Sequence, residues 1–189
     1  TARLARLAGV AARIVPATDG PLRTLVHTPS GTFPFQEWFV ARRHEDEVDA
    51  VSYEGSDVAE PAAAAAEALA AADAILIAPS NPYVSIGPIL AVRGIREAVE
   101  RRRVPCVAVS PLIGGRAVRG PAARMLSRMA GGTEPRHVAG CYEGLIDALV
   151  IDEADAPAAA PVSLVVTRTL MDDVEAARRV AEVALGAAA

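Results

Sequence analysis

The chain has 189 residues, of which 52% are hydrophobic and 22% are charged, and its formal net charge at pH 7 is −4. This size and composition favour a single domain that spans residues 1–189 and has one substantial core, and they exclude a disordered protein. The acidic balance and the lack of a basic tail argue against nucleic acid as a partner. All nineteen basic residues are arginine, so arginine, hydroxyl groups and backbone N–H groups must make any anion contacts.

Cysteine and histidine usage and hydropathy narrow the class of protein further. Cys106 and Cys141 are far apart, and the three histidines show no metal-ligand spacing, so a zinc site is not expected. No apolar run of about 18 residues and no charged-then-apolar leader occurs, which predicts no membrane span, no secretion signal and a cytoplasmic location. The chain opens at Thr1 in a helical pattern without a methionine, which suggests a piece of a longer protein.

The predicted elements alternate along the chain. Strands are predicted over residues 12–16, 22–27, 48–53, 74–78, 104–110 and 162–167, with one more that ends at Asp152. Helices are predicted over residues 33–43, 61–72, 86–103 with a break near Gly94, 121–129 and 172–185. This alternation predicts an α/β fold with a doubly wound, mostly parallel sheet, right-handed crossovers and helices on both faces.

The strand at 74–78 is apolar throughout, which suits a strand covered on both faces, and it is followed by an unusually polar loop. This loop gathers Ser80, Asn81 and Ser85 just before Gly87 and Pro88, where a new helix begins. Open α/β sheets bind phosphate at such a position. Asn-Pro is also an ordinary way to begin a turn, so this loop alone does not establish a site.

A second polar loop follows the next predicted strand. It carries Gly114, Gly115 and Gly120, which would let backbone N–H groups approach an anion, and Arg116 and Arg119, which could neutralise it. Glycine is also ordinary in loops, but consecutive parallel strands are usually neighbours, so both loops are expected to line one crevice. Together they predict a site for a phosphorylated ligand.

Other candidates have a functional and a structural interpretation. Thr28, Ser30 and Gly31 form a third polar loop, or a helix start capped by Thr32. The aromatic residues of the 33–43 helix are interpreted as core in preference to a ring-stacking platform. His27 and His137 are interpreted as structural, and His44 as part of a solvated helix end. An acidic cluster could hold magnesium or could simply be a polar strand exit, and it comprises Asp152, Glu153 and Asp155.

Four segments together resemble one known family. Residues 31–40, 79–90, 110–123 and 150–155 are similar to the 2-phospho-L-lactate transferase family, whose actinobacterial members are phosphoenolpyruvate transferases of coenzyme F-420 biosynthesis. The resemblance implies a Rossmann-like fold, often as a homodimer. It also implies that this chain is the carboxyl-terminal part of the enzyme, without the amino-terminal phosphate loop and metal-binding segment.

The family resemblance implies a reaction and its participants. A phosphoenolpyruvyl or 2-phospho-L-lactyl group passes from a guanosine-diphosphate-linked donor to a hydroxyl of 7,8-didemethyl-8-hydroxy-5-deazariboflavin, GMP leaves, and Mg²⁺ assists with ligands mainly outside this chain. No general base is assigned, and the chain alone is expected to show little activity. Donor contacts are expected first from Ser80, Asn81, Ser85 and Gly87, then from Arg116 and Arg119, with Thr28, Ser30 and Gly31 nearer the acceptor. The alternative is a nucleotide-sugar-binding regulator of the gluconeogenesis-factor type without catalysis.

Overall fold

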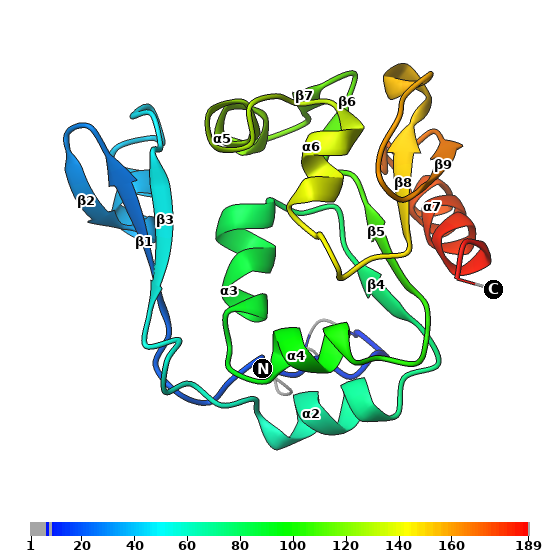
Figure 1. Cartoon of the computed structure of the whole chain (residues 1–189), viewed down its shortest axis with the longest axis horizontal. Coiled ribbons are helices and arrows are strands. Elements are labelled where there is room, and N and C mark those ends of the chain that lie inside the picture. The colour runs from blue at the N-terminus through cyan, green and yellow to red at the C-terminus, as the bar shows by residue number, and fades with distance from the viewer. Residues whose placement is uncertain (1–6, 8, 189) are drawn as a thin grey trace.

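The computed structural model describes residue 7 and residues 9–188, and it contains two main sheets (Figure 1). The parallel sheet has the order β4-β5-β8-β9 and consists of β4 (Ile75–Ile77), β5 (Cys106–Val109), β8 (Ala148–Asp152) and β9 (Ser163–Thr167). The antiparallel sheet has the order β2-β1-β3 and consists of β1 (Arg23–Thr28), β2 (Gly31–Pro34) and β3 (Ala50–Glu54). A small hairpin joins β6 (Leu112–Ile113) to β7 (Arg116–Ala117).

The helices are short except for the last one. They are α2 (Ala63–Ala70), α3 (Gly87–Leu90), α4 (Ile95–Glu100), α5 (Ala122–Met129), α6 (Pro135–Gly140) and α7 (Val174–Gly186). Two π-helical turns are η1 (Glu37–Ala41) and η2 (Pro82–Ile86), and η3 (Glu153–Asp155) is a 3₁₀ turn. Within the described part of the chain, no helix has the length and apolar character needed to cross a bilayer.

Helices cover both faces of the parallel sheet, which confirms the predicted α/β class. Side chains alternate across the sheet, so Val107, Val109 and Val150 pack against α7 through Val180 and Ala184. The opposite face carries Cys106, Ala108, Leu149 and Ile151, which belong to a larger core with residues of α5 and α6. All residues of β5 and β8 are buried, as expected for the centre of a parallel sheet.

Strand β4 differs from the central strands. In the part of the chain that the structure describes, it pairs only with β5, and its outer edge is open. Ile77 is 8% exposed, whereas Leu76 on the other face is 41% exposed. The prediction of a strand covered on both faces is therefore wrong for β4 within the described residues.

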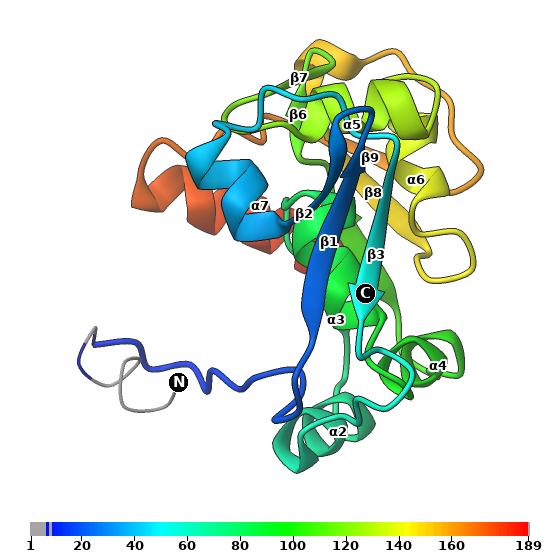
Figure 2. The same cartoon turned by 90° about the vertical axis from the view of Figure 1, so that its left-hand side faces the viewer.

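The amino-terminal third corrects three predictions. Residues 12–16 form no strand, and the predicted helix over 33–43 begins with strand β2 before its helical turn η1. Residues 23–54 form a separate antiparallel arm instead of joining the parallel sheet, as Figure 2 shows with the arm in front. The helical pattern predicted at the start of the chain lies outside the described residues, apart from Leu7. By contrast, the break near Gly94 is confirmed, because Gly94 has φ +90° between α3 and α4.

Candidate functional site

A cavity of about 450 Å³ lies at the carboxyl ends of the parallel strands, between the sheet and the arm. Four segments line it: the loop after β4, the loop after β5, the segment after β9, and the helical turn of the arm. Ligands of open α/β sheets bind at this edge. The polar lining residues are Ser80, Asn81, Ser85, Ser110, Arg119 and Thr169, and the apolar lining includes Phe35, Phe39, Val84, Ile113, Val118 and Met171.

The loop after β4 contributes all three of its predicted polar residues to the cavity. Asn81, however, uses its side chain locally: Oδ1 accepts hydrogen bonds from the backbone N–H groups of Tyr83 at 2.9 Å and Val84 at 3.4 Å. Its Nδ2 lies 3.3 Å from Met125 Sδ. Because Asn81 caps the first helical turn, these N–H groups are not open to a phosphate, and the Ser80 and Ser85 hydroxyls are better placed to meet a ligand.

Gly87 does not line the cavity, and its surroundings give a structural reason for a glycine. A Cβ at this position would lie 1.9 Å from the Tyr53 hydroxyl oxygen and 2.9 Å from the Pro82 carbonyl oxygen. That hydroxyl donates a 2.5 Å hydrogen bond to the Tyr83 carbonyl, and burial raises the pKa of Tyr53 to about 12, which keeps it a donor. Gly87 thus allows strand β3 of the arm to approach η2.

The loop after β5 is more ordered than its composition suggests. Gly114 and Gly115 have φ +56° and +70° and form the two-residue turn between β6 and β7. The Gly115 N–H donates to Asp155 Oδ1 at 2.7 Å. These two glycines, and Arg116 on β7, lie outside the cavity lining. The Gly-Gly pair between two short apolar segments is a sequence signal from which this hairpin could have been predicted.

The end of the same loop does reach the cavity. Arg119 and Gly120 both line it and are both exposed. A Cβ on Gly120 would meet nothing within 4 Å, and its φ is +74°. The loops after β4 and β5 therefore converge on one cavity, with serine hydroxyls contributed by one and a guanidinium contributed by the other.

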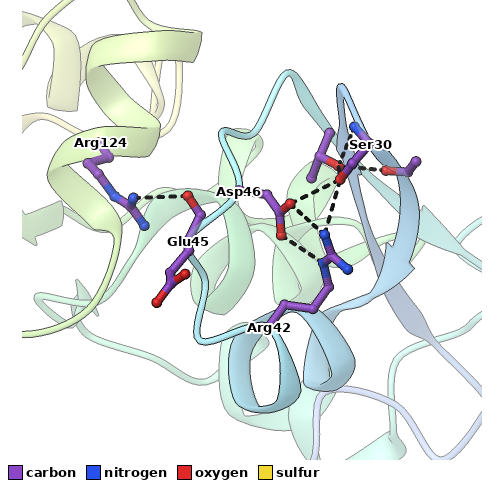
Figure 3. Close-up of polar contacts among 7 residues, drawn as sticks. Ser30, Arg42, Glu45, Asp46 and Arg124 are labelled. Atoms are coloured by element: carbon purple, nitrogen blue, oxygen red, sulfur yellow. Dashed lines mark hydrogen bonds and ion pairs between the residues drawn. The ribbon is translucent and has the colours of Figure 1, made fainter.

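The third predicted loop lies away from this cavity. Thr28, Ser30 and Gly31 belong to the turn between β1 and β2, and Gly31 begins β2, so no helix cap forms at Thr32. Thr28 Oγ1 donates to the Gly31 carbonyl at 2.9 Å, and Ser30 Oγ donates to Asp46 Oδ1 at 3.0 Å. Arg42 holds Asp46 through two nitrogen atoms at 2.6 and 2.7 Å (Figure 3). This ion pair lowers the pKa of Asp46 to about 2.

The aromatic residues and the histidines divide between structure and site. Trp38 is fully buried, as predicted, but Phe35 and Phe39 line the cavity. His27 is structural, as predicted, because its ring nitrogens lie 2.9 Å from Thr32 Oγ1 and 2.8 Å from Ser52 Oγ. His137 accepts from the Glu134 backbone N–H at 3.2 Å, which also fits a structural histidine.

The segment after β9 is a wall of the cavity that sequence reasoning missed. Thr169 lines the cavity, and both its backbone N–H at 2.7 Å and its hydroxyl at 3.1 Å donate to Asp152 Oδ2. Asp152 Oδ1 also accepts from the Ala154 N–H at 2.9 Å. Burial alone would raise the pKa of Asp152, but these hydrogen bonds outweigh it, so the pKa is lowered. The carboxylate fixes the exits of β8 and β9 together.

The acidic cluster favours the interpretation as a polar strand exit. Asp152 and Asp155 accept hydrogen bonds from backbone N–H groups, and Glu153 is exposed. Across the described residues, no group of three or more His, Cys, Asp or Glu side chains is placed to hold a metal ion. These residues therefore do not fit a magnesium site on their own.

The fold and the cavity define a class of protein: an α/β domain with a cavity at the carboxyl ends of its parallel strands that is lined by hydroxyl groups and the Arg119 guanidinium. Residues 1–179 match the family 2-phospho-L-lactate transferase CofD, and the chain belongs to this family. It is 37% identical over 172 residues to a 2-phospho-L-lactate transferase of Methanococcoides burtonii, covering 88% of this chain and 56% of that protein. It is 41% identical over 186 residues to a phosphoenolpyruvate transferase of Kitasatospora aureofaciens, covering 93% and 58% respectively.

Among solved structures, a protein from Bacillus halodurans shares the fold with a TM-score of 0.67 at 16% identity, covering 97% of this chain and 65% of that one. A second structure, described as a member of the UPF0052 family from the same organism, has a TM-score of 0.63 at 16% identity, covering 96% and 64%. The chain spans less than two thirds of the length of the curated relatives described above.

Proposed function

We propose that this chain is the donor-binding part of a CofD-family transferase that acts in coenzyme F-420 biosynthesis. The reaction moves a phosphoenolpyruvyl or 2-phospho-L-lactyl group from a guanosine-diphosphate-linked donor to a hydroxyl of 7,8-didemethyl-8-hydroxy-5-deazariboflavin. The acceptor oxygen forms a bond to the phosphorus of the three-carbon unit, the bond from that phosphorus to GMP breaks, and the hydroxyl proton is lost to a base outside the assigned residues. Support comes from membership of the family and from relatives named for these two transfers.

The observation that carries the proposal is the convergence of the two loops on one cavity. Ser80 and Ser85 offer hydroxyl donors on one side, and Arg119 offers a guanidinium on the other. Phosphoryl transfer depends mainly on positioning and on neutralising negative charge, which such groups can provide. Gly120 adds a place where a ligand can approach the backbone without meeting a side chain.

The apolar side of the cavity supports an acceptor with a planar ring. Phe35 and Phe39 line this side, and their ring centroids lie 5.3 Å apart with an interplanar angle of 32°. Exposed aromatic faces bind flat rings through stacking and burial of apolar surface. We therefore place the deazaflavin on this aromatic wall, formed by Phe35 and Phe39, and the diphosphate on the polar wall, formed by Ser80, Ser85 and Arg119.

The proposal includes a segment amino-terminal to this chain that carries the family's phosphate loop and metal ligands. Support comes from the length of the relatives, since the chain covers only 56% of the Methanococcoides burtonii protein, and from the open edge of β4. Beside that edge lies an apolar groove of about 520 Å³ lined by Leu76, Ile77, Ile89 and Leu90, among others. A further parallel strand with its helix would pair with β4 and cover this groove. Magnesium dependence, a homodimeric state and a cytoplasmic location belong to the same proposal.

Calorimetric titration with GDP and with a nucleotide sugar tests the ligand class. Binding of GDP in preference to the sugar nucleotide supports the transferase. The reverse preference supports a nucleotide-sugar-binding regulator, and binding of neither contradicts both.

A turnover assay with donor, deazaflavin and magnesium tests whether this chain catalyses the transfer without the proposed amino-terminal segment. We expect the chain alone to show little or no transfer, because no general base or metal site is assigned to it. Transfer by the chain alone at the rate of a full-length relative would contradict this expectation.

A further inference from the structure

The aromatic wall of the cavity depends on a turn that lies outside the cavity. Phe35 and Phe39 belong to the helical segment of the arm, which ends in η1 at Ala41 and continues into a turn through Arg43 and His44. The His44 ring centroid lies 5.0 Å from that of Phe39. His44 therefore puts the turn in contact with an aromatic ring that lines the cavity.

This turn has a backbone conformation that requires outside support. Arg43 and His44 have φ values of +53° and +47°, in the left-handed region that residues with a side chain rarely adopt. Two such residues in succession persist only where surrounding contacts hold them. The preceding segment is a π-helical turn, which is also uncommon and is frequent at functional sites.

Arg124 of α5 supplies that support. Its Nη2 donates to the His44 carbonyl and lies 3.3 Å from His44 Nδ1. Its Nη1 donates to the Glu45 carbonyl at 3.4 Å, and Figure 3 shows this second contact. A single guanidinium thus binds two consecutive carbonyl groups of the turn. Helix α5 begins directly after Gly120 and Pro121, which line the cavity, so Arg124 joins the polar wall to the aromatic wall.

We infer that Arg124 is a positioning residue for the aromatic wall, and this inference rests on the proposed function in that the wall receives the acceptor ring. Without the guanidinium, the two carbonyl groups lose their donors and the left-handed turn relaxes. His44 then withdraws from Phe39, and Phe39 shifts in the cavity. The polar wall, formed by the loops after β4 and β5, keeps its own contacts. Binding of the ring therefore weakens more than binding of the diphosphate.

Arg128 provides a matched control on the same helix. It also contacts the arm, but its Nη2 pairs with Asp49 Oδ1 at 2.7 Å and its Nη1 lies 3.7 Å from Glu47 Oε2, beyond the left-handed turn. These are exposed ion pairs, which contribute little. Arg128→Ala removes an arginine from α5 without removing a contact to residues 43–45.

The first measurement is acrylamide quenching of Trp38, which is the chain's single tryptophan, is fully buried and lies on η1. Arg124→Ala is expected to increase the quenching constant, Arg128→Ala to leave it unchanged, and Arg124→Lys to restore it in part, since a lysine donates from one point only. An unchanged quenching constant in Arg124→Ala would overturn the inference.

The second measurement is calorimetric titration of the same variants with the deazaflavin and with GDP. In Arg124→Ala we expect the dissociation constant for the deazaflavin to rise about 3- to 10-fold, the amount that a displaced aromatic contact represents, and that for GDP to stay within about 2-fold. Equal weakening of both ligands would show a general loss of structure and overturn the inference. If the unaltered chain binds neither ligand, the proposed function fails, while the quenching comparison still decides whether Arg124 holds the wall.

Discussion

The parallel sheet and the antiparallel arm form opposite sides of the same cavity, but they are stabilised in different ways. Strands β5 and β8 are buried at every residue, between α7 on one face and α5 and α6 on the other. In β1, by contrast, only Val26 and Thr28 are buried. The arm has a small core, in which Trp38 and Val48 pack with Met125 of α5.

The arm is attached to the rest of the molecule partly by the hydrogen bonds from Arg124 of α5 and by the Tyr53 hydrogen bond to Tyr83. The cavity therefore combines a polar wall at the ends of fully buried strands with an aromatic wall on an arm that has a smaller core. Changes to the sheet should therefore act on global stability, whereas changes to the arm should act on ligand binding or on the contact between the two parts.

The largest effect is expected from the centre of the parallel sheet. Leu149 is fully buried on the α6 face of β8. Leu149→Ala should lower the free energy of unfolding by about 3–4 kcal/mol, because it removes buried methyl groups and leaves a cavity. Urea unfolding followed by circular dichroism measures this change. A loss below about 1 kcal/mol would contradict the view that this sheet dominates stability.

The next largest effect is expected at Asp152, whose carboxylate joins the ends of β8 and β9. Asp152→Ala leaves the N–H groups of Ala154 and Thr169 without their acceptor and should cost about 2–3 kcal/mol. Folding lowers the pKa of Asp152 from its unfolded value of about 3.9. The stability that the Asp152 carboxylate contributes is therefore complete above that value and is lost as the pH falls through the folded pKa. Asp152→Asn should therefore flatten the acid side of the stability profile, and an unchanged profile would refute this role.

The contact between the arm and the helical turn after β4 can be disrupted by a substitution at Gly87. Gly87→Ala places a Cβ against Tyr53 and the Pro82 carbonyl, and we expect a loss of about 1–2 kcal/mol from overpacking. Gly186→Ala, at the end of α7 with nothing within 4 Å, is the matched control and should be neutral or slightly stabilising. Thermal unfolding of both variants makes the comparison, and equal melting temperatures would contradict the close-packing explanation.

The smallest effect is on ligand binding by the polar wall. Arg119→Ala should weaken GDP binding about tenfold, equivalent to about 1.4 kcal/mol. Arg116→Ala is the control, because Arg116 lies on β7 outside the cavity lining. Calorimetric titration of both variants distinguishes the two arginines, and a larger effect at Arg116 would contradict the assignment of the wall.

The sequence predicted the sheet half well and the arm poorly for physical reasons. The apolar runs at 74–78 and 104–110 indicate parallel strands directly, although only the strand from the second run, β5, is buried at every residue. In the arm, Thr32 before Pro34 and the spacing of Phe35, Trp38 and Phe39 imitate a capped amphipathic helix. Here the pairing of β1 with β2 and β3 prevails over the local pattern. Val26 pairs with Val51, a contact that no local spacing reveals.

For the site, the sequence predicted the two loops that converge but not all of their roles. Local composition identifies Ser80, Ser85 and Arg119, which the fold brings to one cavity. It does not reveal that Phe39 and Thr169 complete the lining, because they come from distant parts of the chain. The roles of the individual site residues stay predictions.

A crystal structure of the chain with GDP tests the central claim most directly. The account predicts that the diphosphate lies between the Ser80 and Ser85 hydroxyls on one side and the Arg119 guanidinium on the other. GDP bound at any other surface, with this cavity empty, would contradict it.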